Sequence, residues 1–150
     1  MQWITKKYNQ LSLDELYDIL KVRLEVFSVE QNCPYQDCDG HDRDCLHLFG
    51  VEKNEIVAYS RIAGHGVIYP EASIGRVLTT KPNRGVGLGK ELFKKSLEVL
   101  EANYSGPVKI MAQSYLIKFY NDFGFEVVSE EFLEDGLPHH YMIKEKGLIP

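Results

Sequence analysis

The sequence predicts one α/β domain of the mixed α+β kind, in which a single twisted β-sheet is flanked by helices. The chain has 150 residues, a length typical of one domain, and it contains no repeat, low-complexity run or linker. Strand-like segments pair as hairpins near both ends, with a strand–helix–strand unit between them. A chain of this length buries roughly 70% of its unfolded surface, so it needs neither a disulfide nor a metal to fold. We therefore treat residues 1–150 as one domain.

The first element is a short strand at residues 1–8, and the second is a long helix. Ser12 and Glu15 fit a capping box, which satisfies free backbone amides at a helix start. The helix should end near Gln31, because Pro34 disfavours helical geometry in the residue before it. Its apolar residues share one face at i, i+3, i+4, i+7 spacing, which predicts that this face is buried: Leu13, Leu16, Tyr17, Leu20, Leu24 and Phe27.

The rest of the chain alternates strands, turns and helices. An irregular polar loop covers residues 33–45, and turn-like residues lie at 53–55, 84–89 and 135–138. Strands are predicted at 47–52, 56–63, 72–80, 108–112, 125–129 and 139–144. A helix should follow the glycine-rich turn, and a shorter one should cover 115–123.

Composition excludes several classes of protein. There are 17 basic and 22 acidic side chains, a net charge of −5, which argues against a general nucleic-acid binder. No run approaches the roughly 20 apolar residues that cross a bilayer, so no membrane partner is expected. Residues 1–7 lack the apolar stretch of a signal peptide. Cys33, Cys38 and Cys45 are therefore interpreted as free thiols of a cytoplasmic protein.

The glycine-rich turn Arg84-Gly85-Val86-Gly87-Leu88-Gly89 is the most specific feature. Each glycine in a helix costs about 0.8–1 kcal/mol relative to alanine, so three of them where a helix begins require a reason. A phosphate group supplies one, because bare backbone amides at a helix N-terminus can approach it closely. The P-loop pattern fails here, and so does the G-x-G-x-x-G dinucleotide pattern.

This turn resembles the acyl-CoA motif R/Q-x-x-G-x-G/A of the GNAT superfamily of N-acyltransferases, with Arg84, Gly87 and Gly89 at its fixed positions. Residues 77–79 before it and 119–125 after it match further family elements in the family's order. Segments 23–27, 29–35, 112–113 and 135–139 resemble the ElaA-like branch, and the similarity spans almost the whole chain.

The resemblance implies the GNAT fold, splayed where acyl-CoA lies, and transfer of an acetyl group from acetyl-CoA to a primary amine. By analogy with the family, Tyr120 donates a proton to the leaving thiolate, since a phenol with a pKa near 10 stays protonated at neutral pH. The residues that the resemblance assigns to the cofactor are Val77, Leu78, Thr79, Arg84, Gly85, Val86, Gly87, Leu88, Gly89, Lys90 and Gln113.

The general base is not identified by the resemblance. Some GNAT enzymes carry a glutamate on the strand before the tyrosine helix, and residues 108–112 hold no acid. Glu30, His47 and His139 are candidates, and a water relay is another.

The acceptor is expected to be a small-molecule or peptide amine. Arg23 and Glu30 share a helix face at the place where the family builds its acceptor site. The acidic loop adds Asp37 and Asp39, which could attract a cationic amine. The same loop could equally be a solvated surface.

Two other interpretations stay open. Residues 33–47 hold soft ligands in the order C-x4-C-x2-H-x3-C-x-H, which could form a structural zinc site. The spacing has no C-x2-C pair, so no metal is expected. The chain could also be a CoA-binding sensor or interaction module that has lost catalysis. Monomer and homodimer are both compatible with the sequence.

Overall fold

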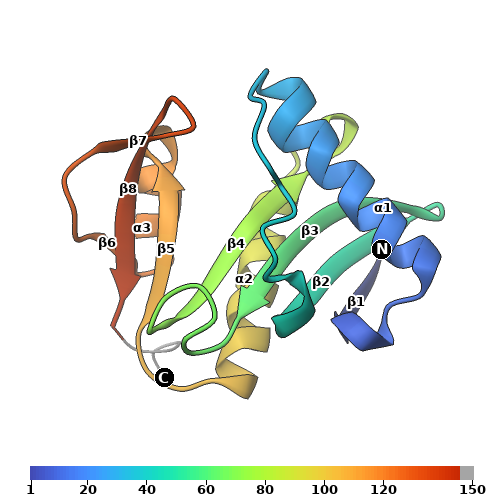
Figure 1. The fold of residues 1–150 in the computed structure, drawn as a ribbon, viewed down its shortest axis with the longest axis horizontal. Coiled ribbons are helices and arrows are strands. Elements are labelled where there is room, and N and C mark those ends of the chain that lie inside the picture. Colours follow the sequence, from blue (N-terminus) through green and yellow to red (C-terminus); the bar gives the residue numbers. More distant parts are fainter. Residues whose placement is uncertain (146–150) are drawn as a thin grey trace.

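The computed structural model describes residues 1–145, which form one sheet of eight strands (Figure 1). The strands are β1 (Gln2–Lys7), β2 (Cys45–Glu52), β3 (Glu55–Ala63), β4 (Ala72–Thr79), β5 (Val108–Gln113), β6 (Glu126–Val127), β7 (Phe132–Glu134) and β8 (Leu137–Lys144). Their order is β1-β2-β3-β4-β5-β8-β6, and β7 also pairs with β8. Among the strands of residues 1–145 only β4 and β5 are parallel neighbours, so the sheet is mixed.

Helices cover both faces of the sheet. They are α1 (Leu13–Leu24), which continues as a wider π turn (Glu25–Glu30), α2 (Leu88–Asn103) and α3 (Ile117–Asn121). Short 3₁₀ turns lie at Tyr8–Gln10, Asp42–Asp44, Lys81–Asn83 and Ser114–Leu116. Figure 1 shows α1 across the front of β1–β3, with α2 and α3 on the opposite face. None of the helices within residues 1–145 is long and apolar enough to cross a membrane.

Two apolar clusters hold these layers together. The larger one packs α2 and α3 against the sheet, with Phe93, Leu97, Ile110 and Met142 among its buried members. The smaller one lies under α1 and is built by Ile19, Val26, Phe49, Tyr59 and Leu78. Neighbours such as Leu48 and Phe49 belong to different clusters, because successive side chains of a strand point to opposite faces.

The start of α1 agrees with the prediction and its buried face does not. The Oγ of Ser12 accepts from the Glu15 amide at 3.0 Å, and the Ser12 amide donates to Glu15 at 2.8 Å, so the capping box is present. Helical backbone ends at Glu30, next to the predicted Gln31. The buried residues, however, are Ile19, Arg23 and Val26, while three members of the predicted face are exposed: Leu13, Tyr17 and Leu24. The helix is turned because Arg23 must reach ion-pair partners beneath it.

Strand β4 is bent by a bulge and then separates from β5. Arg76 has a φ of +52° and adds one residue to β4 opposite β3, between the pairs Tyr59–Leu78 and Arg61–Gly75. Only Ala72 and Ser73 of β4 pair with β5, after which the two strands diverge. The edge of β4 that faces β5 is therefore unpaired along most of its length.

A short strand was missed near the C-terminal end. The sequence predicts a turn over 135–138 and a strand from His139, whereas Leu137 and Pro138 already belong to β8 and pair with β7. Asp135 and Gly136 both have positive φ, so the turn is a two-residue hairpin of type I′. β7 has three residues, too few for a period-2 pattern in the sequence.

Candidate functional site

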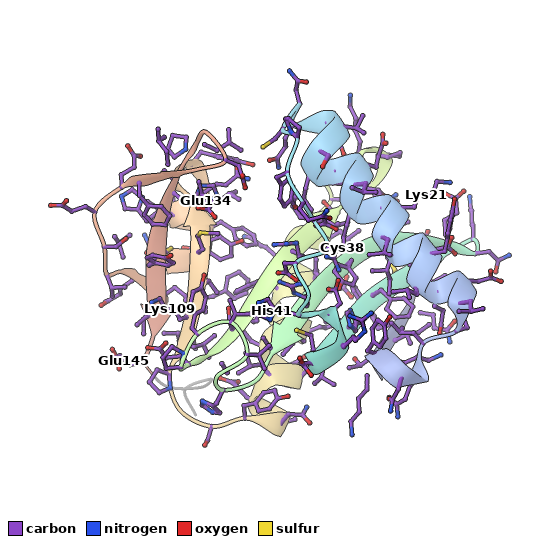
Figure 2. All side chains as sticks on the ribbon, in the orientation of Figure 1. Lys21, Cys38, His41, Lys109, Glu134 and Glu145 are labelled. Atoms are coloured by element: carbon purple, nitrogen blue, oxygen red, sulfur yellow. The ribbon has the colours of Figure 1, made fainter. Side chains whose placement is uncertain are left out.

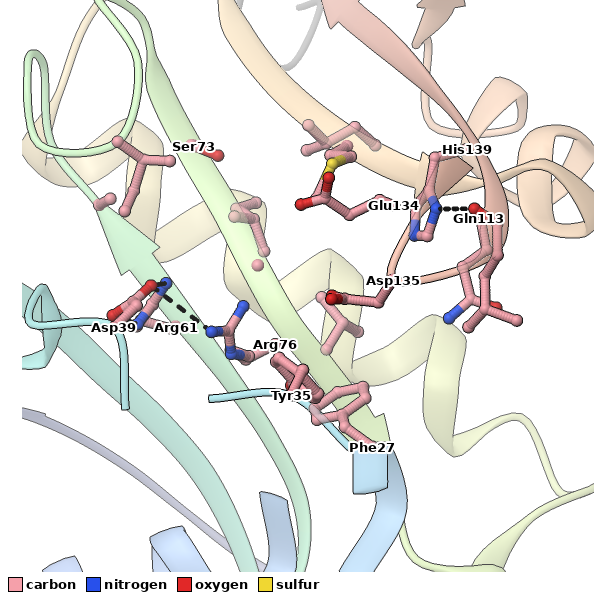
Figure 3. A pocket seen from close by; sticks show the side chains of 18 of the residues that line it. Phe27, Tyr35, Asp39, Arg61, Ser73, Arg76, Gln113, Glu134, Asp135 and His139 are labelled. Carbon is pink, nitrogen blue, oxygen red and sulfur yellow. Dashed lines mark hydrogen bonds and ion pairs between the residues drawn. The ribbon is translucent and has the colours of Figure 1, made fainter. Parts of the chain in front are cut away.

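A cavity of about 570 Å³ opens where β4 and β5 diverge. The π turn and residues 33–41, β3, β4, β5, Tyr120 and the β7–β8 hairpin all contribute side chains to it. Figure 3 shows two opposed walls. We call the wall made by residues 33–45 with β3 and β4 the loop wall, and the wall made by β7, its turn and β8 the hairpin wall.

The loop wall is held together by three arginines and three aspartates. Arg23 of α1 donates to Asp37 at 2.8 Å and to Asp42 at 2.7 Å. Arg61 of β3 contacts Asp39 at 2.7 Å and Asp42 at 3.0 Å. The bulge residue Arg76 contacts Asp37 at 2.8 Å. Each aspartate therefore meets at least one guanidinium, and the six formal charges cancel.

These contacts determine the pKa values of the loop aspartates and whether their charges are available to a ligand. Burial alone would raise the pKa of Asp39, but hydrogen bonds from Arg61 and the His41 amide lower it overall. The pKa of Asp42 is lowered in the same way by Arg23 and Arg61. Arg23 and Asp37 are buried away from the cavity, and Asp39 lines it only as the partner of Arg61. Asp37 and Asp39, the two loop residues expected from the sequence to attract a cationic acceptor, thus already face guanidinium groups and offer no unpaired charge to it.

The two candidate histidines differ in what their ring nitrogens contact. Nε2 of His47 faces the Asp42 carbonyl at 2.9 Å and must donate, so Nδ1 accepts from the Tyr59 hydroxyl at 2.7 Å. His47 is fully buried, its pKa is lowered by burial, and it does not line the cavity. It is therefore not placed to take a proton from an acceptor.

His139 is placed differently. It lines the cavity, and its Nδ1 lies 2.7 Å from the Leu137 carbonyl, to which it must donate. In the neutral ring that bond places the proton on Nδ1, so Nε2 is the nitrogen that can accept a proton. The ring stacks on Phe132, which holds its orientation in the hairpin wall.

Glu30, the third candidate base, forms an ion pair with Arg84. Its carboxylate receives two hydrogen bonds from Arg84, at 2.8 and 3.1 Å. Arg84 also donates twice to the Thr79 carbonyl, so the pair joins the π turn, the end of β4 and the glycine-rich turn. Glu30 does not line the cavity. Arg84 is thereby held by protein groups rather than left free.

The glycine-rich turn leaves the N-terminus of α2 open. Gly85 and Gly87 have φ of +85° and +83°, a region that favours glycine. No side chain caps α2, so its first amides have no such partner. Gly89 has an ordinary φ, and a Cβ there would meet no atom within 4 Å. Neither the backbone conformation nor a neighbouring atom in residues 1–145 requires a glycine at position 89. A ligand bound at the helix N-terminus would require one, because a Cβ there would keep it from the backbone amides.

Tyr120 lies at the floor of the cavity. Its ring packs edge-on against Phe93 and Phe119, with centroids 5.0 and 5.1 Å away. Burial and the neighbouring Tyr115 raise the pKa of the Tyr120 phenol to about 12. Its hydroxyl has no hydrogen-bond partner among the residues that the structure describes. The group is therefore a protonated phenol that is free to donate.

Sequence reasoning missed two groups of lining residues. On the hairpin wall, Glu134 and Asp135 make no ion pair within residues 1–145, and Figure 3 shows the Glu134 carboxylate turned toward the cavity. Tyr69 and Tyr141 add an aromatic surface, with the Lys109 ammonium 4.9 and 4.5 Å from their centroids. Glu134 and Asp135 reach the site through the β7–β8 pairing, which the sequence does not reveal, and Tyr69 reaches it from the segment between β3 and β4.

The cysteines and histidines of residues 33–47 point to different places. Cys33 lines the cavity and lies 3.5 Å from the Asp135 carbonyl, Cys38 is exposed and Cys45 is buried. Both nitrogens of His47 are already hydrogen-bonded. Nowhere in residues 1–145 do three potential ligands form a metal-binding group.

Gln113 and the last part of β4 are the residues beside the splay that the resemblance assigns to the cofactor. Gln113 lines the cavity and donates to Gln31 at 3.4 Å, which links β5 to the end of the π turn. Val77 also lines the cavity, and residues 77–79 lie on the unpaired edge of β4. The predicted cofactor residues 77–79 and 113 therefore lie on the two sides of the splay.

Comparison with known proteins agrees with this geometry. Residues 20–146 match the family model described as an acetyltransferase (GNAT) domain. Protein ElaA of Escherichia coli is 40% identical over 148 residues, which cover 97% of each chain. The crystal structure of ElaA superimposes with a TM-score of 0.90 at 41% identity, covering 96% of this chain and 99% of that one. A Pseudomonas aeruginosa acyl-CoA N-acyltransferase gives the same TM-score at 38% identity, covering 95% and 98%. The expected GNAT fold is confirmed.

Proposed function

Because this chain belongs to the GNAT acetyltransferase family, in the branch that includes ElaA, we propose that it transfers an acetyl group from acetyl-CoA to a primary amine. One observation carries the proposal. Tyr120 and His139, a free proton donor and a free proton acceptor, line the same cavity at the divergence of β4 and β5. Acyl transfer to an amine needs one group of each kind.

The cofactor side consists of backbone more than side chains. Amides of residues 85–90 at the N-terminus of α2 suit the pyrophosphate, since a helix N-terminus carries partial positive charge. The unpaired edge of β4 at Val77, Leu78 and Thr79 suits the pantetheine amides, which can add to it like a strand. Arg84, held by Glu30, is a positioning residue that fixes the turn between them.

Two side chains carry the proton transfers. Acetyl-CoA supplies the thioester when bound. The amine nitrogen forms a bond to the acyl carbon, and the carbon–sulfur bond breaks. Nε2 of His139 takes the proton that the amine loses, and Tyr120 gives its phenolic proton to the departing sulfur and regains one from solvent. Glu30 and His47 have no part in these steps.

The acceptor is proposed to be a cationic small molecule or peptide amine. Its positive charge faces Glu134 and Asp135, the unpaired carboxylates of the hairpin wall, instead of Asp37 or Asp39. Glu134 and His139 share a face of the hairpin, because Glu134 pairs with Leu137 and His139 pairs with Phe132. One hairpin can therefore both attract the amine and deprotonate it. A cytoplasmic location is part of the proposal, since the three cysteines are free thiols.

A second candidate is a CoA-binding module without catalysis. The observation in its favour is β5, whose residues beside the cavity, Met111 and Gln113, carry no acid. In that case acyl-CoA would bind and no amine would be acetylated.

One experiment separates these functions. Thermal melting with and without acetyl-CoA measures binding, and thiol release from acetyl-CoA measures transfer over a panel of polyamines, amino sugars, aminoglycosides and peptides. We expect a raised melting temperature and thiol release with a cationic primary amine. Tyr120→Phe should keep the melting shift and lose about 10²–10⁴-fold in turnover. Binding without release over the whole panel would favour the module, and absence of binding would contradict both.

A further inference from the structure

The outward face of α1 carries an apolar stripe. Leu13, Tyr17 and Leu24 are 87%, 71% and 47% exposed, and the half-buried Leu20 lies between them at i+7 from Leu13. Figure 1 shows α1 as the outermost layer over β2 and β3. The opposite face of the helix supplies its own core contacts, so the stripe is not needed to attach α1 to the sheet.

A comparison with α2 shows how unusual this stripe is. None of the large apolar side chains of α2 is exposed. The residues that form its apolar stripe are all buried: Leu88, Leu92, Phe93, Leu97 and Leu100. An exposed apolar patch with helical periodicity is typical of a protein interface.

We propose that this stripe binds the same stripe of a second copy of the chain, with the two α1 helices antiparallel. The four residues of the stripe lie symmetrically about the point between residues 18 and 19, so two antiparallel copies bring an apolar residue opposite each of them. In an antiparallel pair Leu13 faces the partner's Leu24, and Tyr17 faces the partner's Leu20. A two-fold symmetric dimer makes each of these contacts twice.

Charge on the flank of the stripe selects this arrangement. Asp14 and Lys21 are exposed on the same flank of α1, at 100° per residue. Neither makes an ion pair within residues 1–145. Figure 2 shows the position of Lys21 beside α1. In an antiparallel pair equal flanks meet, so Lys21 lies beside the partner's Asp14 on both sides of the two-fold axis. In a parallel pair this flank would meet the opposite flank of the other helix, where Leu16 and Phe27 carry no charge.

The size of the stripe sets the expected strength. A helix of 12 residues is about 18 Å long, so its face buries less than the roughly 800 Å² per partner of a standard interface. We expect a weak dimer with a dissociation constant on the order of 100 µM.

Charge reversal tests the proposal. Sedimentation equilibrium of the full chain between about 10 µM and 1 mM should show a monomer–dimer equilibrium. Lys21→Glu alone and Asp14→Lys alone should each weaken self-association at least about tenfold, because both create like-charged pairs. An equimolar mixture of the two variants should dimerise again, since every pair is then of opposite sign.

Lys94→Glu is the matched control, because Lys94 is exposed on α2, on the other face of the sheet from α1, and its substitution should leave the dimer unchanged. Circular dichroism melting of each variant checks that the fold is retained. A wild-type chain that stays monomeric at 1 mM would overturn the proposal. The proposal would also be overturned if Lys21→Glu left the dissociation constant of the dimer unchanged, or if the mixture of Lys21→Glu and Asp14→Lys failed to dimerise. The outcome does not depend on acetyl transfer.

Discussion

The loop wall and the hairpin wall enclose one cavity and treat charge in opposite ways. On the loop wall Asp37, Asp39 and Asp42 are each matched by an arginine, and Asp37, Arg23 and Arg61 of this network are buried. On the hairpin wall Glu134 and Asp135 have no ion-pair partner within the described chain, and His139 keeps one nitrogen free. The first arrangement uses charge to hold a loop in place, and the second leaves charge available to a ligand. The density of acidic residues in a sequence therefore does not locate a cation site.

The largest expected effect concerns the free nitrogen of the hairpin wall. His139→Gln should lower turnover by about 10²–10⁴-fold, because glutamine cannot accept the proton of the amine. Acetyl-CoA binding, measured by thermal shift, should stay unchanged. His140→Gln is the control, since His140 contacts Ser114 and does not line the cavity. Equal turnover in His139→Gln and wild type would remove His139 from the proton path.

The loop wall should instead respond in stability. Asp37→Asn leaves Arg23 and Arg76 without one of their carboxylates, and breaking a buried pair costs about 3–5 kcal/mol. Urea unfolding followed by circular dichroism measures this loss. Asp44→Asn, an exposed loop residue without an ion pair in residues 1–145, should change the unfolding free energy little. A loss no larger than that of the control would mean that the network does not stabilise the loop.

Removing one charge from the hairpin wall should have a moderate effect on the acceptor. Glu134→Gln should raise the KM of a cationic amine about 3–10-fold at low salt, and the difference should shrink as salt screens the charge. Glu134 is exposed, so the effect is smaller than that of a buried pair. Asp39→Asn, whose carboxylate already serves Arg61, provides the comparison. A larger rise in KM for Asp39→Asn than for Glu134→Gln would reverse our assignment of the two walls.

The smallest effect is the pH dependence of the loop wall. The folded pKa values of Asp39 and Asp42 lie below their ordinary value. Such groups contribute their full stability above the unfolded pKa, near 3.9, and lose it as pH falls through the folded pKa. Unfolding free energy should therefore be insensitive to these groups from pH 7 to 5 and decline below about pH 4. Asp39→Asn should flatten that decline. A decline of unchanged steepness would assign it to other carboxylates.

Local signals in the sequence predicted the local structure well. The capping box at Ser12, the glycines before α2 and the predicted strands depend on neighbours in the chain, and each is present, although β2 and β8 begin two residues earlier than predicted. The buried face of α1 was not, because Arg23 is drawn inward by Asp37 and Asp42, which lie 14 and 19 residues away. When a helix has apolar residues on two faces, its sequence does not show which face packs against the sheet.

The candidate site was predicted unevenly for the same reason. Tyr120 and Gln113 belong to short motifs and line the cavity at the splay, while the glycine-rich turn precedes α2, and the roles that the sequence assigns to them stay predictions. Glu134 and Tyr141 were missed, because strand pairing across the sheet brings them to the cavity. The loop aspartates were misjudged, because their partners come from α1, β3 and β4. Their neutralisation is a property of the tertiary structure.

The short ladder between β4 and β5 has a consequence for how the molecule opens. Two residue pairs join the strands before the splay to those after it, so the hydrogen bonds between strands divide into two units, residues 2–79 and 108–144, which also share the larger apolar cluster. Native-state amide exchange should reveal these units as sets of protons with different opening free energies. A ligand seated along the splay would touch both units and couple their openings. Exchange in β3 and β8, which lie on opposite sides of the splay, should then slow together.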